Sequence, residues 1–160
     1  MPYTTIYDSP LGQLLLTGDG ENLTALEFLD EPWRGENQSQ PPFDCVKQWL
    51  DAYFRGENPE ITFSMAPAGT AFQRQVWQLL RQIPPGASLT YGQIAREMAA
   101  LTGKERMSAQ AVGQAVGRNP IPILIPCHRV LGAGRRLTGY ACGLDRKRWL
   151  LDHENCPYTD

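Results

Sequence analysis

A segment rich in proline and glycine between residues 55 and 69 divides this chain into two stretches with different patterns. Short alternating apolar runs, typical of strands, come before it, and apolar residues at helical spacing come after it. The charge changes at the same place, because residues 1–70 hold 3 basic and 11 acidic side chains and residues 71–160 hold 12 and 6. The sequence therefore predicts two lobes, residues 1–69 and 70–160. The basic second lobe suits a polyanion such as nucleic acid, with a merely solvated charged surface as the alternative.

The rest of the composition excludes several classes of protein. The 160 residues are 42% hydrophobic, which is typical of a globular chain. No apolar run approaches the roughly 18 residues of a membrane span, and the first residues lack the layout of a signal peptide. Cys45, Cys127, Cys142 and Cys156 are too irregularly spaced for a secreted disulfide scaffold. We therefore expect a cytoplasmic protein with no membrane partner, in which the cysteines are thiols.

The first lobe reads as a small antiparallel sheet followed by a helix. The expected strands are Thr4–Tyr7, Gln13–Thr17 and Leu23–Phe28, separated by turn-forming residues. Apolar residues then recur at helical spacing from Phe43 to Phe54, where Gly56 ends the helix, and Ile61–Phe63 is a further short strand.

The second lobe begins with two helix start signals of the same kind. Thr70 and Thr90 are each followed three residues later by glutamine, which is the pattern of a capping box. Pro84-Pro85-Gly86 is expected to end the first of these helices. A third helix should run from the N-cap Ser108 through Gly117, and with its predecessor it forms either a helix-turn-helix or a plain packing hairpin.

This third helix has an unusual composition. Small residues dominate it, and only Gln110, Gln114 and Arg118 reach outward. Gly113 and Gly117 each cost about 1 kcal/mol relative to alanine inside a helix, so close approach of another group should offset that cost. That group is either a neighbouring helix or the groove of a DNA duplex.

The candidate chemical centre is Cys127 with the adjacent His128, placed at the end of the apolar run Ile121–Ile125. An imidazole lowers the pKa of a thiol and makes it a nucleophile. Because neighbouring side chains diverge, His128 should reach Cys127 through a water, and Glu154, at the end of the helix from Leu144 to His153, is the candidate that holds the histidine tautomer.

Three other readings of these residues remain open. The pair could be an inert buried cysteine beside a core histidine, or part of a cysteine hydrolase. Zinc could be bound by Cys127, His128, Cys142, His153 and Cys156, although no Cys-x-x-Cys pair exists, and we expect no metal.

From Thr70 onward the chain closely resembles the methylated-DNA-[protein]-cysteine S-methyltransferases, the O6-alkylguanine-DNA alkyltransferases. The matching segments are Phe72–Trp77, Thr90–Ala95, Ala111–Ala115, Asn119–Val130, Thr138–Tyr140 and Lys147–Glu154. Residues 1–69 resemble the ribonuclease-H-like lobe of the same family. The resemblance implies an α+β protein, with a small antiparallel-sheet lobe followed by a mostly helical alkyltransferase domain that contains a helix-turn-helix.

The resemblance also implies direct-reversal DNA repair. Cys127 would take an alkyl group from O6 of guanine, and from O4 of thymine, in one irreversible turnover without a cofactor. His128 and Glu154 would activate the thiol, Asn119 would tie the recognition helix to the active-site turn, and Tyr91 would assist base flipping and donate a hydrogen bond to the leaving oxygen.

The same likeness assigns the binding residues. The slot for the guanine would be lined by Val130, Tyr140, Ala141 and Cys142. Contacts with DNA would come from Arg106, Gln110, Ala111, Gly113, Gln114 and Arg118. The expected partner is double-stranded DNA bound through its minor groove by a monomer.

The chain departs from the family pattern at three places. Gln110 stands where an intercalating arginine is usual, the loop before it, which holds Arg106, is longer, and Cys142 replaces a glycine. The competing function is a DNA-binding module that flags alkylguanine without repairing it. In such relatives another residue, commonly tryptophan, replaces the nucleophilic cysteine, whereas this chain keeps Cys127.

Overall fold

The computed structural model describes residues 2–160 and divides into two compact units, one ending at Ala68 and the other comprising Gly69–Asp160. Gly69 belongs to the second unit, one residue before the boundary expected from the sequence. Its absent side chain makes room for Trp77, because a Cβ on Gly69 would lie 2.5 Å from that ring. Each unit is described separately below.

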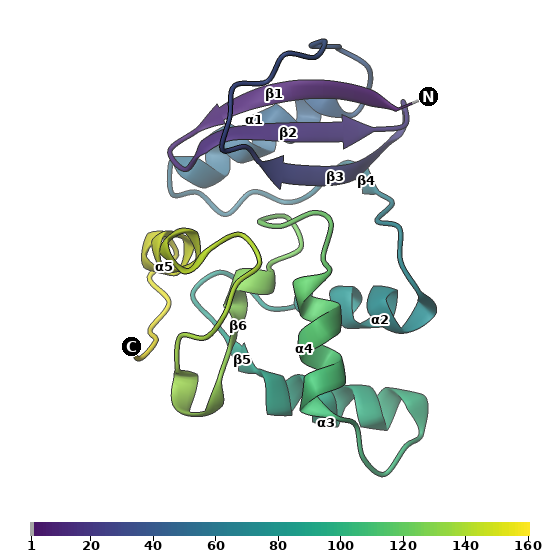
Figure 1. Cartoon of the computed structure of the whole chain (residues 1–160), viewed down its shortest axis with the longest axis vertical. Helices are drawn as coiled ribbons and strands as arrows, with labels where there is room; N and C mark the ends of the chain where they lie inside the picture. Colours follow the sequence, from purple (N-terminus) through teal and green to yellow (C-terminus); the bar gives the residue numbers. More distant parts are fainter. Residues whose placement is uncertain (1) are drawn as a thin grey trace. The chain divides into compact units, whose positions relative to one another are not determined.

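The first unit is a four-stranded sheet with one helix (Figure 1). Its elements are β1 (Tyr3–Ser9), β2 (Gly12–Gly18), β3 (Asn22–Phe28), α1 (Phe43–Phe54) and β4 (Ser64–Met65). The strands β1, β2 and β3 form the predicted antiparallel meander, and β4 adds to β3 in parallel. Buried residues of α1, among them Phe43, Val46 and Leu50, complete the core with Leu14, Leu16 and Leu26 of the sheet.

The prediction of a strand at Ile61–Phe63 was wrong by about three residues. Residues 61–63 form no regular structure, and ladder pairing begins only where the chain reaches β3, at Asn22 with Ser64 and Leu23 with Met65. Pattern alone does not place the partner strand, and the partner decides which residues are paired.

The second unit is mostly helical (Figure 1). Its longer elements are α2 (Ala71–Leu80), α3 (Tyr91–Thr102), α4 (Ala109–Gly117) and α5 (Leu144–His153). Its short elements are β5 (Leu89–Thr90), the turn η1 (Cys127–Arg129), β6 (Val130–Leu131) and the turn η2 (Ala133–Arg135). Helix α4 packs against both α2 and α3, and β5 pairs with β6 in parallel.

The helix boundaries follow from local chemistry. Both predicted capping boxes are present, with the hydroxyls of Thr70 and Thr90 each accepting from the backbone N–H of the glutamine three residues on. Ser108 caps α4, and Gly103 ends α3 in the left-handed conformation that glycine adopts without strain. Helix α2 ends at Leu80, before the expected Pro84-Pro85-Gly86, because the chain passes into tight turns there.

Helices α3 and α4 are the two helices of the predicted helix-turn-helix, and α2 is hydrogen-bonded to α4. The indole N–H of the buried Trp77 in α2 donates to the carbonyl of Ala115 in α4 at 2.8 Å. Among residues 2–160, none of the helices has the length and apolar character that a membrane crossing requires.

Candidate active site

A cavity of about 280 Å³ opens between α4 and the loop that follows β6. Its lining residues are Tyr91, Gly113, Val116, Gly117, Asn119, Pro122, Cys127, Gly139, Tyr140, Ala141 and Cys142. The lining contains two thiols, Cys127 and Cys142, and Cys127 is only 6% exposed.

Burial and the hydrogen bonds of Asn119 fix the segment before Cys127. Residues 121–130 are all buried, and Asn119 closes the segment on itself. Its amide donates to the carbonyl of Ile125 at 2.7 Å, and its side-chain oxygen accepts from the backbone N–H of Ile121 at 2.9 Å. Since Asn119 directly follows the end of α4, it connects this helix to the turn that carries Cys127.

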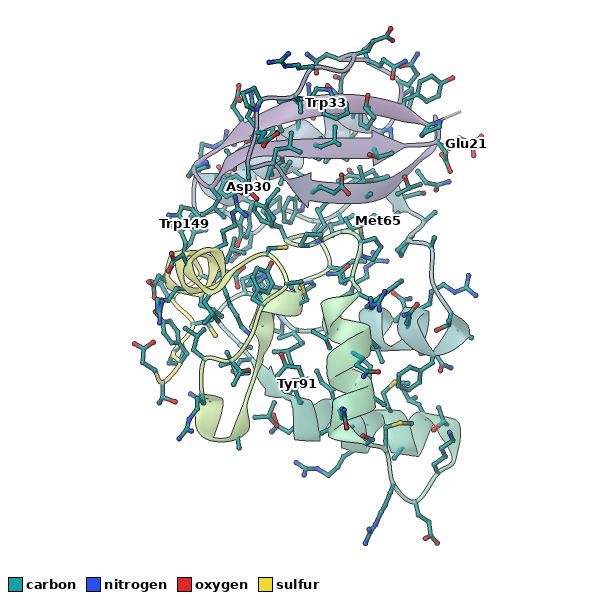
Figure 2. The ribbon with its side chains drawn as sticks, in the orientation of Figure 1. Glu21, Asp30, Trp33, Met65, Tyr91 and Trp149 are labelled. Carbon is teal, nitrogen blue, oxygen red and sulfur yellow. The ribbon has the colours of Figure 1, made fainter. Side chains whose placement is uncertain are left out.

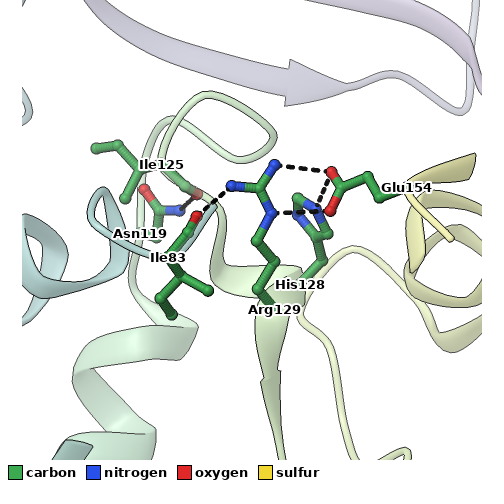
Figure 3. A network of polar contacts seen from close by, with 6 residues as sticks. All are labelled: Ile83, Asn119, Ile125, His128, Arg129 and Glu154. Carbon is green, nitrogen blue, oxygen red and sulfur yellow. Dashed lines mark hydrogen bonds and ion pairs between the residues drawn. The ribbon is translucent and has the colours of Figure 1, made fainter. Parts of the chain in front are cut away.

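Behind Cys127 lies a buried network of three charged or polar side chains (Figure 3). Glu154 accepts from Nε2 of His128 at 2.7 Å and from Nε and Nη2 of Arg129 at 2.8 and 2.9 Å. Arg129 also donates to the carbonyl of Ile83. The carboxylate of Glu154 therefore holds the imidazole and the guanidinium at the same time.

The electrostatics of this network fix the state of His128. Burial alone would raise the pKa of Glu154, but the hydrogen bonds and charges of His128 and Arg129 outweigh it and hold that pKa well below its usual value. Burial lowers the pKa of His128 more than Glu154 raises it, so the imidazole is neutral at neutral pH. Because an ionised carboxylate only accepts, the proton of the neutral ring is on Nε2 and the lone pair is on Nδ1.

Nδ1 of His128 is buried and has no hydrogen-bond partner among residues 2–160. It is thus the basic atom of the site. The thiol of Cys127 needs such a base, since burial raises its pKa although Asn119, Tyr140 and the charge of Lys147 act to lower it.

Lys147 is a functional residue that the sequence analysis did not single out. Its buried ammonium donates to the carbonyls of Val130 at 2.7 Å, Thr138 at 3.0 Å and Gly139 at 3.4 Å. The Nζ atom also lies 5.9 Å from the ring centroid of Tyr140. Lys147 therefore fastens the wall of the cavity to β6. The signal in the sequence was a lysine three residues before Leu150, on the apolar side of α5.

Tyr91 forms the opposite wall at the start of α3 (Figure 2). A Cβ on Gly113 would lie 3.8 Å from the Tyr91 ring, and one on Gly117 would meet no atom within 4 Å. The two glycines of α4 therefore leave space for the cavity, and they do not serve a tight contact between helices. Burial raises the pKa of Tyr91, so its phenol stays protonated.

The outward side chains predicted for α4 are exposed. Gln110, Gln114 and Arg118 lie on its surface, and Ala111, Gln114 and Arg118 share a shallow groove with the start of α2. Arg106 lies on a different groove, beside Arg96 and Lys104.

One expected lining residue and one alternative set of ligands are not found in the places the sequence suggested. Val130 does not line the cavity, because its side chain is fully buried in β6, where it is paired with Leu89 and its carbonyl holds Lys147. The alternative zinc set does not assemble either, since no group of three or more His, Cys, Asp or Glu within residues 2–160 has an arrangement that would hold a metal ion.

Comparison with known proteins assigns both units to one family. Residues 71–156 match the 6-O-methylguanine DNA methyltransferase, DNA binding domain, and residues 2–67 match the ribonuclease-like domain of the same family. The chain is 42% identical to the methylated-DNA–protein-cysteine methyltransferase of Haemophilus influenzae, over 99% of this chain and 89% of that protein. It is 46% identical to the protein of that name from Mycobacterium leprae, over 92% of this chain and 88% of that protein.

Solved structures agree with the sequence relatives. The crystal structure of Mycobacterium tuberculosis OGT in complex with DNA superposes with a TM-score of 0.82 at 42% identity, covering 96% of this chain and 92% of that chain. These matches extend over both units and include the whole of the candidate site. The chain therefore belongs to the 6-O-methylguanine DNA methyltransferase family.

Proposed function

We propose that this protein repairs alkylated DNA by direct reversal, with Cys127 as the acceptor of an alkyl group from O6 of guanine. The observation that carries the proposal is the position of Cys127 in the cavity wall, next along the chain to His128, whose Nε2 is hydrogen-bonded to the buried Glu154. The family and the DNA complex of a relative support DNA as the partner. A module that only flags lesions does not need this nucleophile and its base.

The proton of Cys127 leaves toward His128. A water between Sγ and Nδ1 passes the proton to the imidazole, because Nδ1 carries the free lone pair and Nε2 is engaged by Glu154. The resulting imidazolium is stabilised by the adjacent carboxylate. Since the pKa of His128 is lowered, the base remains available below the ordinary imidazole pKa of about 6.5.

The thiolate then attacks the alkyl carbon in line with the bond to O6. The S–C bond forms as the C–O6 bond breaks, and the electron pair passes to the guanine oxygen, where the protonated phenol of Tyr91 donates a hydrogen bond. Cys127 keeps the alkyl group as a thioether, which has no good leaving group. Each molecule therefore reacts once, and the step consumes no cofactor.

The lesion reaches Cys127 only after it leaves the base stack. We place α4 in the minor groove, with Gln110, Ala111, Gln114 and Arg118 toward the DNA and the flipped base in the cavity beside Gly113. O4 of alkylated thymine presents the same kind of carbon and is a second substrate. All of the proposed residues belong to one chain, so a monomer suffices.

Intact mass spectrometry after incubation with duplex DNA containing O6-methylguanine tests this function. We expect one addition of about 14 Da, the difference between a thiol and its methyl thioether. The addition should be absent in Cys127→Ser and present in the matched variant Cys45→Ser, which changes an exposed cysteine. Binding of the lesion without a mass change would favour the flagging module, and repeated turnover or methylation of another cysteine would contradict the proposal.

Gln110 carries the second prediction of this function. Its side chain is exposed at the second position of α4, where it can fill the gap left by the flipped base but brings no charge. Gln110→Ala should slow repair of duplex DNA and leave the reaction with free O6-methylguanine unchanged, since the free base needs no flipping. Gln110→Arg should tighten duplex binding by about 1 kcal/mol and steepen its salt dependence.

Rates of repair on duplex and free base, measured in parallel, check this prediction. Gln75→Ala is the matched control, an exposed glutamine of α2 outside the described cavity and grooves. If Gln110→Ala repairs duplex at the normal rate and Arg106→Ala does not, the role in flipping belongs to Arg106.

A further inference from the structure

The cavity contains a second thiol that the proposed repair reaction does not use. Cys142 is half-buried in the cavity wall that faces Cys127, and both cysteines line the same space of about 280 Å³. The Tyr140 hydroxyl acts on both sulfurs, because it lowers the pKa of each thiol. The charge of Cys127 also contributes to the pKa of Cys142, which burial raises to about 11. The two sulfurs and the phenol of Tyr140 therefore belong to the lining of one small cavity.

The segment that carries Cys142 is held by Lys147 at the carbonyls of Thr138 and Gly139 and by Arg146 at the carbonyl of Cys142, but it has open space beside its two glycines. It is a turn closed by a hydrogen bond from the N–H of Gly143 to the carbonyl of Tyr140 at 2.9 Å. Gly139 and Gly143 flank it, and a Cβ on either would meet no atom within 4 Å. By contrast, Cys127 lies in a fully buried segment. A movement of the turn, and not of the active-site segment, is then what brings the sulfurs to the bonding distance of about 2.05 Å.

We propose that Cys127 and Cys142 form a reversible disulfide, which makes this pair a redox modification site inside the substrate cavity. The oxidant is a peroxide. The Cys127 thiolate attacks one peroxide oxygen and becomes a sulfenic acid as the O–O bond breaks, and the hydroxide or alkoxide that leaves takes up the proton lost by the thiol and departs as water or an alcohol. The Cys142 thiol then attacks the sulfenic sulfur, the S–S bond forms, and hydroxide leaves and takes the thiol proton as water.

The bond has two chemical consequences. It removes the nucleophile, so alkyl transfer stops while the bond exists, and it prevents further oxidation of Cys127 to the sulfinic acid, which thiols do not reverse. A dithiol reductant supplies two electrons and two protons and restores both thiols. The effect on repair rests on the proposed function, whereas the bond itself does not.

Hydrogen peroxide treatment of the full chain in a Cys45→Ser background, which removes the exposed thiol, tests the proposal. We expect an intact mass lower by about 2 Da, the two hydrogens lost on forming a disulfide. Digestion without reduction should yield a peptide that joins Cys127 to Cys142. Dithiothreitol should restore the original mass and the methyl transfer activity measured before oxidation.

The additional change Cys142→Ser separates a disulfide from general oxidation, with each variant compared with its own activity before peroxide. In this variant we expect mass gains of two or three oxygens on Cys127, the sulfinic and sulfonic acids, and a loss of activity that dithiothreitol does not reverse. The proposal is overturned if the joined peptide does not form, if it links other cysteines, or if both proteins recover equally. Because mass reports the bond directly, its failure is distinguishable from a failure of methyl transfer.

Discussion

Replacing Glu154 by glutamine is expected to destabilise the protein by about 3–5 kcal/mol and to slow methyl transfer by a factor of roughly 10²–10⁴. The stability is lost because the buried guanidinium of Arg129 loses the charge that compensates it and one of its two hydrogen bonds to position 154, since an amide nitrogen does not accept. The rate is lost because a glutamine amide that donates to Nε2 of His128 moves the ring proton to Nδ1, which then accepts nothing. Urea unfolding and single-turnover methyl transfer measure the two effects.

The pH dependence of this difference has a defined sign. The pKa of Glu154 is depressed in the folded chain, so its contribution to the free energy of unfolding is present above the unfolded pKa of about 4.5 and disappears as the pH falls through the folded value. The stability gap between the normal protein and Glu154→Gln should therefore be constant from pH 8 to about 5 and should narrow below that.

Two further variants keep this prediction falsifiable. Asp152→Asn makes the same chemical change at an exposed position of α5 and should alter stability by no more than about 0.5 kcal/mol. The double variant Arg129→Met with Glu154→Gln removes both charges, so it should regain part of the stability but none of the rate. Recovery of the rate in the double variant would show that Glu154 acts on stability alone.

The sequence predicted elements whose signals are local. Capping boxes at Thr70 and Thr90 and the N-cap Ser108 place the starts of three helices, because these signals depend only on residues within one turn. The position of β4 was missed because it depends on a partner strand far away in the sequence, and the end of α2 was missed because the chain enters tight turns before the expected Pro84-Pro85-Gly86.

The same distinction holds at the site. The pairing of His128 with Glu154 could be predicted from the sequence, because an imidazole needs an acceptor that fixes its tautomer. The hydrogen bonds from Arg129 to the same carboxylate could not be predicted. The two residues are 25 positions apart, and no residue near Arg129 in the sequence indicates that they meet in space. Val130 was placed in the wall by resemblance, whereas the pleat of β6 turns its side chain into the core and leaves only its carbonyl to the site.

Replacing Lys147 by methionine is expected to slow methyl transfer by roughly 10–100-fold with little change in affinity for DNA. Methionine fills similar space but donates nothing, so the carbonyls of Thr138 and Gly139 lose the group that fixes the cavity wall beside Tyr140. The positive charge that lowers the pKa of Cys127 also disappears, and each unit of thiol pKa is worth about 1.4 kcal/mol. Single-turnover rates with free O6-methylguanine, together with duplex binding, separate reaction from recognition.

The pH dependence of the rate and of the stability distinguishes an electrostatic role of Lys147 from a purely structural one. Burial lowers the pKa of Lys147 to about 8, so the ammonium loses its charge as the pH rises through that value, and the rate advantage over Lys147→Met should narrow above pH 8.

The free energy of unfolding should change in the opposite direction. The unfolded chain, with a lysine pKa of about 10.5, binds more protons between pH 8 and 10.5, so the unfolding free energy of the normal protein should rise over this range relative to that of the variant. Arg146→Met, which changes a neighbouring cation that donates to the carbonyl of Cys142, should show neither trend. Parallel profiles for the normal protein and Lys147→Met, both in rate and in stability, would mean that the buried ammonium acts by filling space and not by its charge.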